Sequence, residues 1–121
     1  MDLGIRDRSA IVCASSRGLG RACALSLARE GVHVTLNARN AEALAATAEE
    51  IRGATGVRVA AVAGDVALEA TRSALLAACP APDILVTNNG GPAPGRFQDW
   101  DRSAWLAACE ANMLAPLLLI R

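Results

Sequence analysis

The stretch Ile11-Val12-Cys13-Ala14-Ser15-Ser16-Arg17-Gly18-Leu19-Gly20 decides the fold. A short apolar run ends at Ala14, small residues follow, and the pattern becomes helical at Gly18. A helix that begins directly after a strand and a Gly-rich turn offers free backbone N–H groups and the positive end of its dipole to an anion. Small residues leave room for a phosphate beside the main chain. The stretch therefore predicts a phosphate-binding turn, and an ordinary strand-to-helix turn is the alternative.

Length and composition favour one folded unit. The chain has 121 residues, 53% of them hydrophobic, which suits a buried core and excludes disorder. Twelve basic residues balance twelve acidic ones, so the chain lacks the excess positive charge that is typical of nucleic-acid-binding proteins. No uninterrupted apolar run reaches bilayer length, and no secretory leader is recognisable. We expect a cytoplasmic protein that binds neither nucleic acid nor membrane.

The residue types that are missing limit the chemistry. His33 is the single histidine, so a histidine-based metal site or a Ser-His-Asp triad within the chain is excluded, and no metal is expected. There is no tyrosine, and all twelve basic residues are arginine. A mechanism that needs a phenol or an amine must find it outside these residues. The four cysteines form no CxxC pair and are expected to be small buried hydrophobes: Cys13, Cys23, Cys79 and Cys109.

Apolar runs and helical periodicity alternate along the chain. Strands are expected at 9–14, 32–38, 57–63 and 83–88. Helices are expected at 18–30, 41–52 and 67–79, and from about 101 to the last residue. In the first helix Leu19, Cys23 and Leu27 share one stripe and are expected to face the core. Asn40 is the expected cap of the second helix, and Gly53 its expected end.

The order β-α-β-α-β-α-β-α predicts an α/β fold, the first half of a Rossmann-type doubly wound parallel sheet, as one unit over residues 1–121. Ligands of such sheets bind at the carboxyl ends of the strands. Four stretches are expected to meet there: 14–20, 37–39, 64–66 and 88–91.

The residues after the second strand predict the kind of nucleotide. That position faces the adenosine ribose in doubly wound folds, and an acidic residue there would bind a free 2′-hydroxyl. Here Asn37 and Ala38 are followed by Arg39, and Arg17 lies in the phosphate turn. Guanidinium groups make charge-assisted bonds to phosphate, so the pair favours NADP(H) over NAD(H). The alternative is that both arginines are solvated loop residues.

The remaining two stretches supply polar groups and small residues. Asp65 can accept a hydrogen bond from the adenine amine beside Val66, or it can cap a turn. The side chains of Asn88 and Asn89 can bond neighbouring loops. Gly90 and Gly91 let the backbone pass close to a ligand, and a plain turn is the alternative.

In the last helix Asn112 lies four residues before Pro116. Because proline has no N–H, the Asn112 carbonyl loses its helical partner and becomes a place for an ordered water. A simple kink in a packing helix is the alternative.

Taken together, these residues resemble the short-chain dehydrogenase/reductase family, and the bacterial 3-oxoacyl-carrier-protein reductase group most closely. The family turn Thr-Gly-x-x-x-Gly-x-Gly corresponds to residues 13–20, with Ala14 at the first glycine. Its Asn-Asn-Ala-Gly corresponds to residues 88–91, with Gly90 at the alanine. Its adenine-contacting aspartate matches Asp65, and its active-site asparagine matches Asn112.

The resemblance implies an oxidoreductase site of which this chain carries part. The implied catalytic residue is Asn112, whose main-chain carbonyl would hold a water. The implied cofactor-binding residues are Ala14, Ser16, Arg17, Gly18, Leu19, Gly20, Arg39, Asp65, Val66, Asn89, Gly90 and Gly91. The catalytic serine and the Tyr-x-x-x-Lys pair of the family lie beyond the fifth helix and are not among these 121 residues, so the chain alone is expected to be inactive.

Two functions remain open. The first is an NADP-dependent oxidoreductase acting on a small carbonyl or alcohol, including 3-oxoacyl thioesters, with this chain as its amino-terminal part. The second is a non-catalytic module that holds nucleotide or pairs with another chain. A methyltransferase would favour an acidic residue where Ala38 and Arg39 stand. By family resemblance, the helix from Trp105 to Ile120 is expected to join subunits into a homo-oligomer, and a second chain supplying the missing half is the other possibility.

Overall fold

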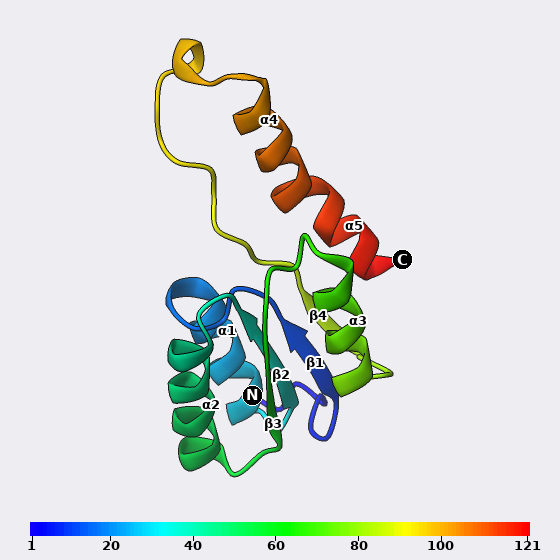
Figure 1. Cartoon of the computed structure of the whole chain (residues 1–121). Coiled ribbons are helices and arrows are strands. Elements are labelled where there is room, and N and C mark those ends of the chain that lie inside the picture. Colours follow the sequence, from blue (N-terminus) through cyan, green and yellow to red (C-terminus); the bar gives the residue numbers. More distant parts are fainter.

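The computed structural model describes residues 1–121, and its core is a parallel sheet between two helical layers (Figure 1). The four strands lie in the order β3-β2-β1-β4. Their bounds are β1 (Ser9–Val12), β2 (His33–Ala38), β3 (Val59–Ala63) and β4 (Ile84–Val86). This order, with every pair parallel, confirms the first half of a Rossmann-type doubly wound sheet.

Each face of the sheet has its own apolar core. Helices α1 (Gly18–Arg29) and α2 (Ala41–Thr55) cover the face that carries Ala10 and Val12. Helices α3 (Glu69–Ala78) and α5 (Ala115–Ile120) pack on the opposite face, which carries Ile11 and Cys13. Alternate side chains of one strand thus reach both cores, which is why β1 is apolar throughout. Burial raises the pKa of the Cys13 thiol to about 11, so this sulfur is an inert part of the core.

The buried face of α1 differs from the expected stripe. Of the three residues expected on that stripe, Leu27 is partly buried against the core, whereas Leu19 is 79% exposed and Cys23 is exposed. The buried residues of the helix are Gly20, Ala24 and Ala28. The helix is turned by one residue because small side chains let it lie close to β1. The expectation of four buried cysteines is therefore also wrong, since only Cys13 and Cys79 are buried.

Helix α2 begins as expected and ends later. The Asn40 side chain caps it by accepting a bond from the Ala43 N–H at 2.9 Å. Gly53 lies inside the helix, where a Cβ added to it would have nothing within 4 Å, and Gly56 ends the helix with a left-handed φ of 71°. A glycine in an exposed turn of a helix costs only about 1 kcal/mol, so Gly53 does not stop the helix. The predicted end at Gly53 was wrong.

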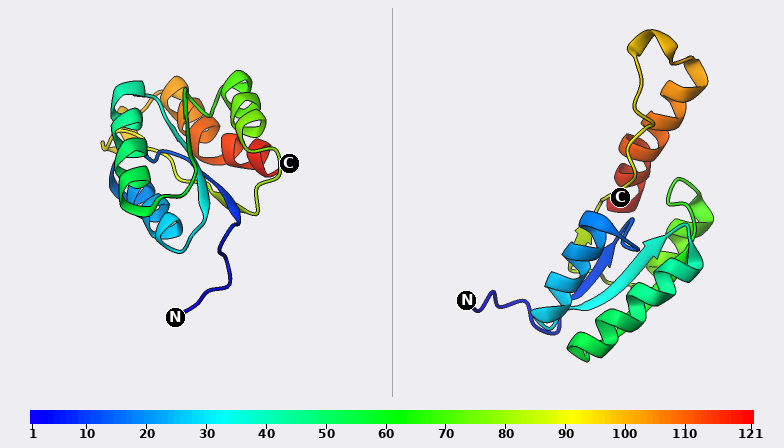
Figure 2. Two further views of the ribbon diagram at one scale, coloured as in Figure 1. Left: turned by 90° about the horizontal axis from the view of Figure 1, so that it is seen from below. Right: turned by 90° about the vertical axis from the view of Figure 1, so that its left-hand side faces the viewer.

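The last helix is continuous but changes its hydrogen bonding. A short 3₁₀ turn, η1 (Phe97–Asp99), precedes α4 (Arg102–Cys109), and a π-helical segment, η2 (Glu110–Leu114), joins α4 to α5. Helix α4 projects beyond the carboxyl ends of the strands, while α5 packs on the sheet (Figure 2). The span Arg102–Ile120 has 19 residues and, by length and composition alone, is apolar enough to cross a membrane. Its exposed apolar residues are Trp105, Leu106, Met113, Leu114, Leu117, Leu118 and Ile120.

Candidate functional site

The four stretches expected to meet do meet, around a cavity of about 380 Å³ at the carboxyl ends of the strands. The strands are short and in register, so the turns that follow them lie at one edge of the sheet. The cavity is lined by Ala14, Ser16, Arg17, Asn37, Ala38, Arg39, Asn40, Ala43, Gly64, Asp65, Val66, Asn89 and Gly90.

The turn after β1 presents unpaired backbone N–H groups. The first-turn N–H groups of any α-helix have no acceptor within the helix, and no side chain caps them in α1. The N–H of Arg17 also has no acceptor in the chain. Gly20 allows this turn to lie against the strand, since a Cβ there would be 2.2 Å from the Ala14 carbonyl oxygen. The region is thus a cradle of N–H donors at the positive end of a helix, suited to a phosphate.

Ala14 holds an unusual backbone conformation at the place of the family's first glycine. Its φ is +48°, in the left-handed region that non-glycine residues avoid. The Asn88 side chain donates to its carbonyl at 3.3 Å, which links the turn to the segment after β4. The chain thus keeps the glycine-like shape with an alanine, at a cost in conformational strain.

A buried polar pair, not expected from the sequence, joins three of the four stretches. The Asn37 N–H donates to the Ser15 hydroxyl at 3.0 Å, and the Ser15 N–H donates to the Asn37 carbonyl at 2.8 Å. The Asn37 amide also donates to the carbonyls of Val62 and Gly64, at 2.9 and 3.1 Å. Asn37 is therefore occupied in positioning the turns and is not free for a ribose.

The two arginines in this region are available to an anion. Arg17 and Arg39 are both exposed on the cavity wall, and neither guanidinium makes a hydrogen bond or ion pair with the rest of the chain. No carboxylate follows β2, because the strand ends at Ala38 and the next two residues are Arg39 and Asn40. The cavity wall beside the end of β2 is therefore cationic.

One carboxylate oxygen of Asp65 accepts a hydrogen bond within the turn after β3, and the other has no partner in the chain. Its Oδ1 accepts from the Ala67 N–H at 2.9 Å, as the turn-capping alternative requires. The second oxygen has no partner within the chain and can accept a further hydrogen bond. Arg72 holds the same turn by donating from Nη1 to the carbonyls of Val66 and Ala67, each at 2.8 Å.

A second cavity of about 370 Å³ adjoins the first, with Arg39, Asp65, Asn89 and Gly90 lining both. Gly91 and Asn112 line its polar side. Trp100 and Trp105 line its apolar side and meet edge to face, with ring centroids 5.4 Å apart. Of the expected site residues, Gly18, Leu19 and Gly20 line neither cavity and form the start of α1.

Pro116 has no N–H, so it cannot donate to the carbonyl of Asn112 or of Ala111, and the water expected at the Asn112 carbonyl stays a prediction. Asn112 lies four residues before the proline, which is the spacing of an α-helical hydrogen bond. Ala111 lies five residues before it, which is the spacing of a π-helical hydrogen bond, and η2 is π-helical. The Asn89 side chain donates to the Ala111 carbonyl at 2.7 Å. The Asn112 side chain donates to the Ala108 carbonyl at 3.1 Å. The segment after β4 is therefore fastened to the irregular part of this helix.

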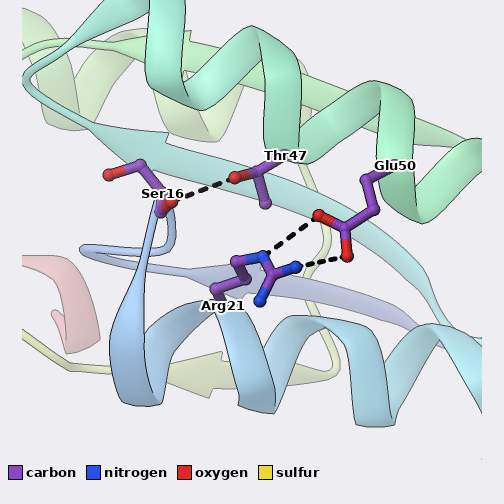
Figure 3. A network of polar contacts seen from close by, with 4 residues as sticks. All are labelled: Ser16, Arg21, Thr47 and Glu50. Atoms are coloured by element: carbon purple, nitrogen blue, oxygen red, sulfur yellow. Dashed lines mark hydrogen bonds and ion pairs between the residues drawn. The ribbon is translucent and has the colours of Figure 1, made fainter.

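Helix α2 is fastened to the phosphate turn and to α1 (Figure 3). The Thr47 hydroxyl donates to the Ser16 carbonyl at 3.0 Å. The Arg21 guanidinium pairs with both carboxylate oxygens of Glu50, and each group shifts the other's pKa, raising that of Arg21 and lowering that of Glu50. Neither contact could be read from local sequence patterns, because the partners are far apart in the chain.

This fold and site define the protein's family. A sequence model of the short chain dehydrogenase family matches residues 8–121, and the chain belongs to that family. The uncharacterized oxidoreductase YvaG of Bacillus subtilis is 33% identical over 100% of this chain and 46% of its own length. The L-sorbose reductase of Gluconobacter frateurii, solved with NADPH and L-sorbose, is 33% identical with a TM-score of 0.92. A metagenomic short-chain oxidoreductase solved with NADP is 34% identical with a TM-score of 0.84.

The chain spans about half the length of the relatives it matches. It aligns over its full length with L-sorbose reductase and covers 48% of that protein, and 96% of it aligns with 54% of the metagenomic oxidoreductase. These similarities include the last helix, which the family match covers to residue 121.

Proposed function

We propose that these residues form the nucleotide-binding part of an NADP-dependent oxidoreductase. The observation that carries the proposal is the cationic wall of the first cavity: Arg17 and Arg39 are unpaired, and no carboxylate follows β2. Beside the end of β2, a free 2′-hydroxyl would find no acidic acceptor, whereas a 2′-phosphate would find the guanidinium groups of Arg17 and Arg39. The NADPH- and NADP-bound relatives support the same cofactor.

The other residues fit a dinucleotide. The N–H groups at the start of α1 suit its pyrophosphate, and Gly20 lets this end of the helix lie close to Ala14. The free oxygen of Asp65 suits the adenine amine, with Val66 beside the ring. Reduced NADP would supply the hydride. This chain's own residues bind and orient the nucleotide.

The substrate in this proposal is a small carbonyl or alcohol, with 3-oxoacyl thioesters among the candidates. Reduction of a carbonyl requires a proton at the developing alkoxide. These 121 residues contain neither tyrosine nor lysine, so the donor comes from other residues. Asn112 contributes its main-chain carbonyl, which Pro116 leaves without an α-helical partner and which can hold a water for proton transfer.

Subunit contact is part of the proposal. Strand β4 lies at one edge of the sheet, and the exposed apolar side chains of α4 and α5 need a covering surface. We place the protein in the cytoplasm as a homo-oligomer joined through the helix from Trp105 to Ile120, with a second chain that completes the sheet as the other arrangement. The full-length similarity to L-sorbose reductase favours this packing role over a membrane span.

Calorimetric titration tests the cofactor. The complete polypeptide that contains residues 1–121 should bind NADP(H) more tightly than NAD(H). A charge-assisted hydrogen bond contributes about 1.5–3 kcal/mol, so Arg39→Ala should weaken NADP(H) binding by roughly ten- to a hundredfold and leave NAD(H) binding nearly unchanged.

The matched control is Arg58→Ala, an exposed arginine before β3 at the opposite end of the sheet. It should change neither affinity. Tighter binding of NAD(H) by the wild type, or an unchanged preference in Arg39→Ala, would contradict the proposal.

A further inference from the structure

Thr47 lies in the middle of α2, outside both cavities, and contacts the phosphate turn. Its side chain is almost fully buried, with the residue 4% exposed. Its hydroxyl donates to the Ser16 carbonyl across 31 residues of sequence. Valine would fill the same space, so packing alone does not require a hydroxyl here.

The Ser16 carbonyl controls the direction of the next N–H. In a planar trans peptide the C=O and the following N–H point in opposite directions. Figure 3 shows the Ser16 carbonyl directed at Thr47 and the Ser16 hydroxyl directed away from it. The N–H of Arg17, which has no acceptor in the chain, therefore points away from Thr47.

Arg39, the other arginine of the cationic wall, lies just before the same helix. Helix α2 begins at Ala41, directly after Arg39 and its cap Asn40. It is also joined to α1 by Arg21 and Glu50 (Figure 3). Helix α2 thus connects the Ser16-Arg17 turn to Arg39, and it fixes their spacing through one partly buried hydrogen bond and one exposed ion pair.

We infer that Thr47 is a positioning residue that sets the Ser16-Arg17 turn against Arg39 and thereby favours nucleotides with a phosphorylated ribose. The inference rests on the proposed function. Without the hydroxyl, the Ser16 carbonyl loses its donor and its peptide is free to rotate, which misaligns the Arg17 N–H and side chain. The adenine contacts at Asp65 and the N–H groups inside the first turn of α1, from Gly18 on, which would hold the 5′-phosphate, are not affected.

The test compares adenosine 2′,5′-bisphosphate with adenosine 5′-monophosphate, in titrations of the complete polypeptide that contains residues 1–121. Thr47→Val should weaken binding of the bisphosphate by about three- to tenfold, the loss expected from one hydrogen bond, and leave the monophosphate unchanged. Thr47→Ser retains the hydroxyl and should restore the wild-type ratio. Thr47→Ala is a second variant without the hydroxyl, should valine impair folding.

The matched control is Thr55→Val, on the same helix. The Thr55 hydroxyl donates within α2 to the Ile51 carbonyl and contacts no part of the site. This variant should lower stability at most and leave the ratio of the two affinities unchanged.

Several results overturn the inference. An unchanged ratio in both Thr47→Val and Thr47→Ala, an equal weakening of both nucleotides, or the same change in Thr55→Val would show that Thr47 acts on stability alone. A wild type that binds neither nucleotide, or binds both equally, contradicts the proposed function itself and the inference with it.

Discussion

Replacement of Gly20 by alanine tests the contact that builds the phosphate turn. The added Cβ would lie 2.2 Å from the Ala14 carbonyl oxygen and 2.9 Å from the Asn88 side-chain nitrogen. Unstrained contacts need about 3.5 Å, so α1 and the end of β1 must separate by roughly 1 Å. Overpacking costs about 1–3 kcal/mol, and loss of the Asn88–Ala14 bond adds about 0.5–1.5. The higher helix propensity of alanine returns at most about 1 kcal/mol. We expect a net loss near 2 kcal/mol.

Urea unfolding measures this loss, and Gly53→Ala provides a matched control. Gly53 also lies in a helix but has nothing within 4 Å of its added Cβ, so alanine there should raise the free energy of unfolding by about 1 kcal/mol. The same substitution should therefore have opposite signs at the two positions. A Gly20→Ala variant as stable as the wild type would refute the close approach of α1 to Ala14.

Three further predictions concern single residues. The left-handed backbone conformation of Ala14 costs about 1–2 kcal/mol, which Ala14→Gly removes. Glycine also makes the unfolded chain more flexible, which lowers stability by about 0.5–1 kcal/mol, so urea unfolding should show equal or slightly greater stability. A clear loss there would mean that the methyl group packs usefully. In the complete polypeptide that contains residues 1–121, Pro116→Ala supplies the missing N–H and should lower turnover while cofactor affinity stays nearly constant. Unchanged turnover in steady-state kinetics would leave only a packing role for the proline. The Ser9 N–H and, less strongly, Arg8 lower the pKa of Asp83 in the folded state. Its stabilising effect is therefore present above a normal carboxyl pKa near 4 and lost as the pH falls through the lowered value. The stability difference between wild type and Asp83→Asn should shrink in acid, and a difference independent of pH would contradict this origin.

The sheet could be predicted from the sequence because parallel strands buried on both faces are continuously apolar, as in β1. The site could be located because the fold brings the carboxyl ends of all strands together, whatever lies between them. The face of α1 could not be predicted, since in a helix of small residues a shift of one position leaves the apolar pattern nearly unchanged. The end of α2 was missed because Gly53 and Gly56 look alike locally, and only Gly56 adopts a left-handed conformation.

Contacts between distant segments were the hardest features to predict from the sequence. The Ser15–Asn37 pair and the bond from Thr47 to Ser16 join residues 22 and 31 positions apart, and neither has a local signature. Asn37 is an example. Its position at the end of β2 suggests contact with the ribose of a nucleotide, whereas its side-chain amide donates to the carbonyls of Val62 and Gly64.

The central claim is that residues 1–121 supply the nucleotide site and other residues supply the proton donor. The most direct test uses the purified 121-residue chain, with its mass confirmed. NADPH binding is followed by fluorescence, and NADPH oxidation is followed by absorbance with a panel of ketones and 3-oxoacyl thioesters. We predict measurable binding without turnover, because a positioned acid contributes typically about 10²–10⁴-fold and no tyrosine or lysine is present. Saturable turnover by this chain alone would contradict the account.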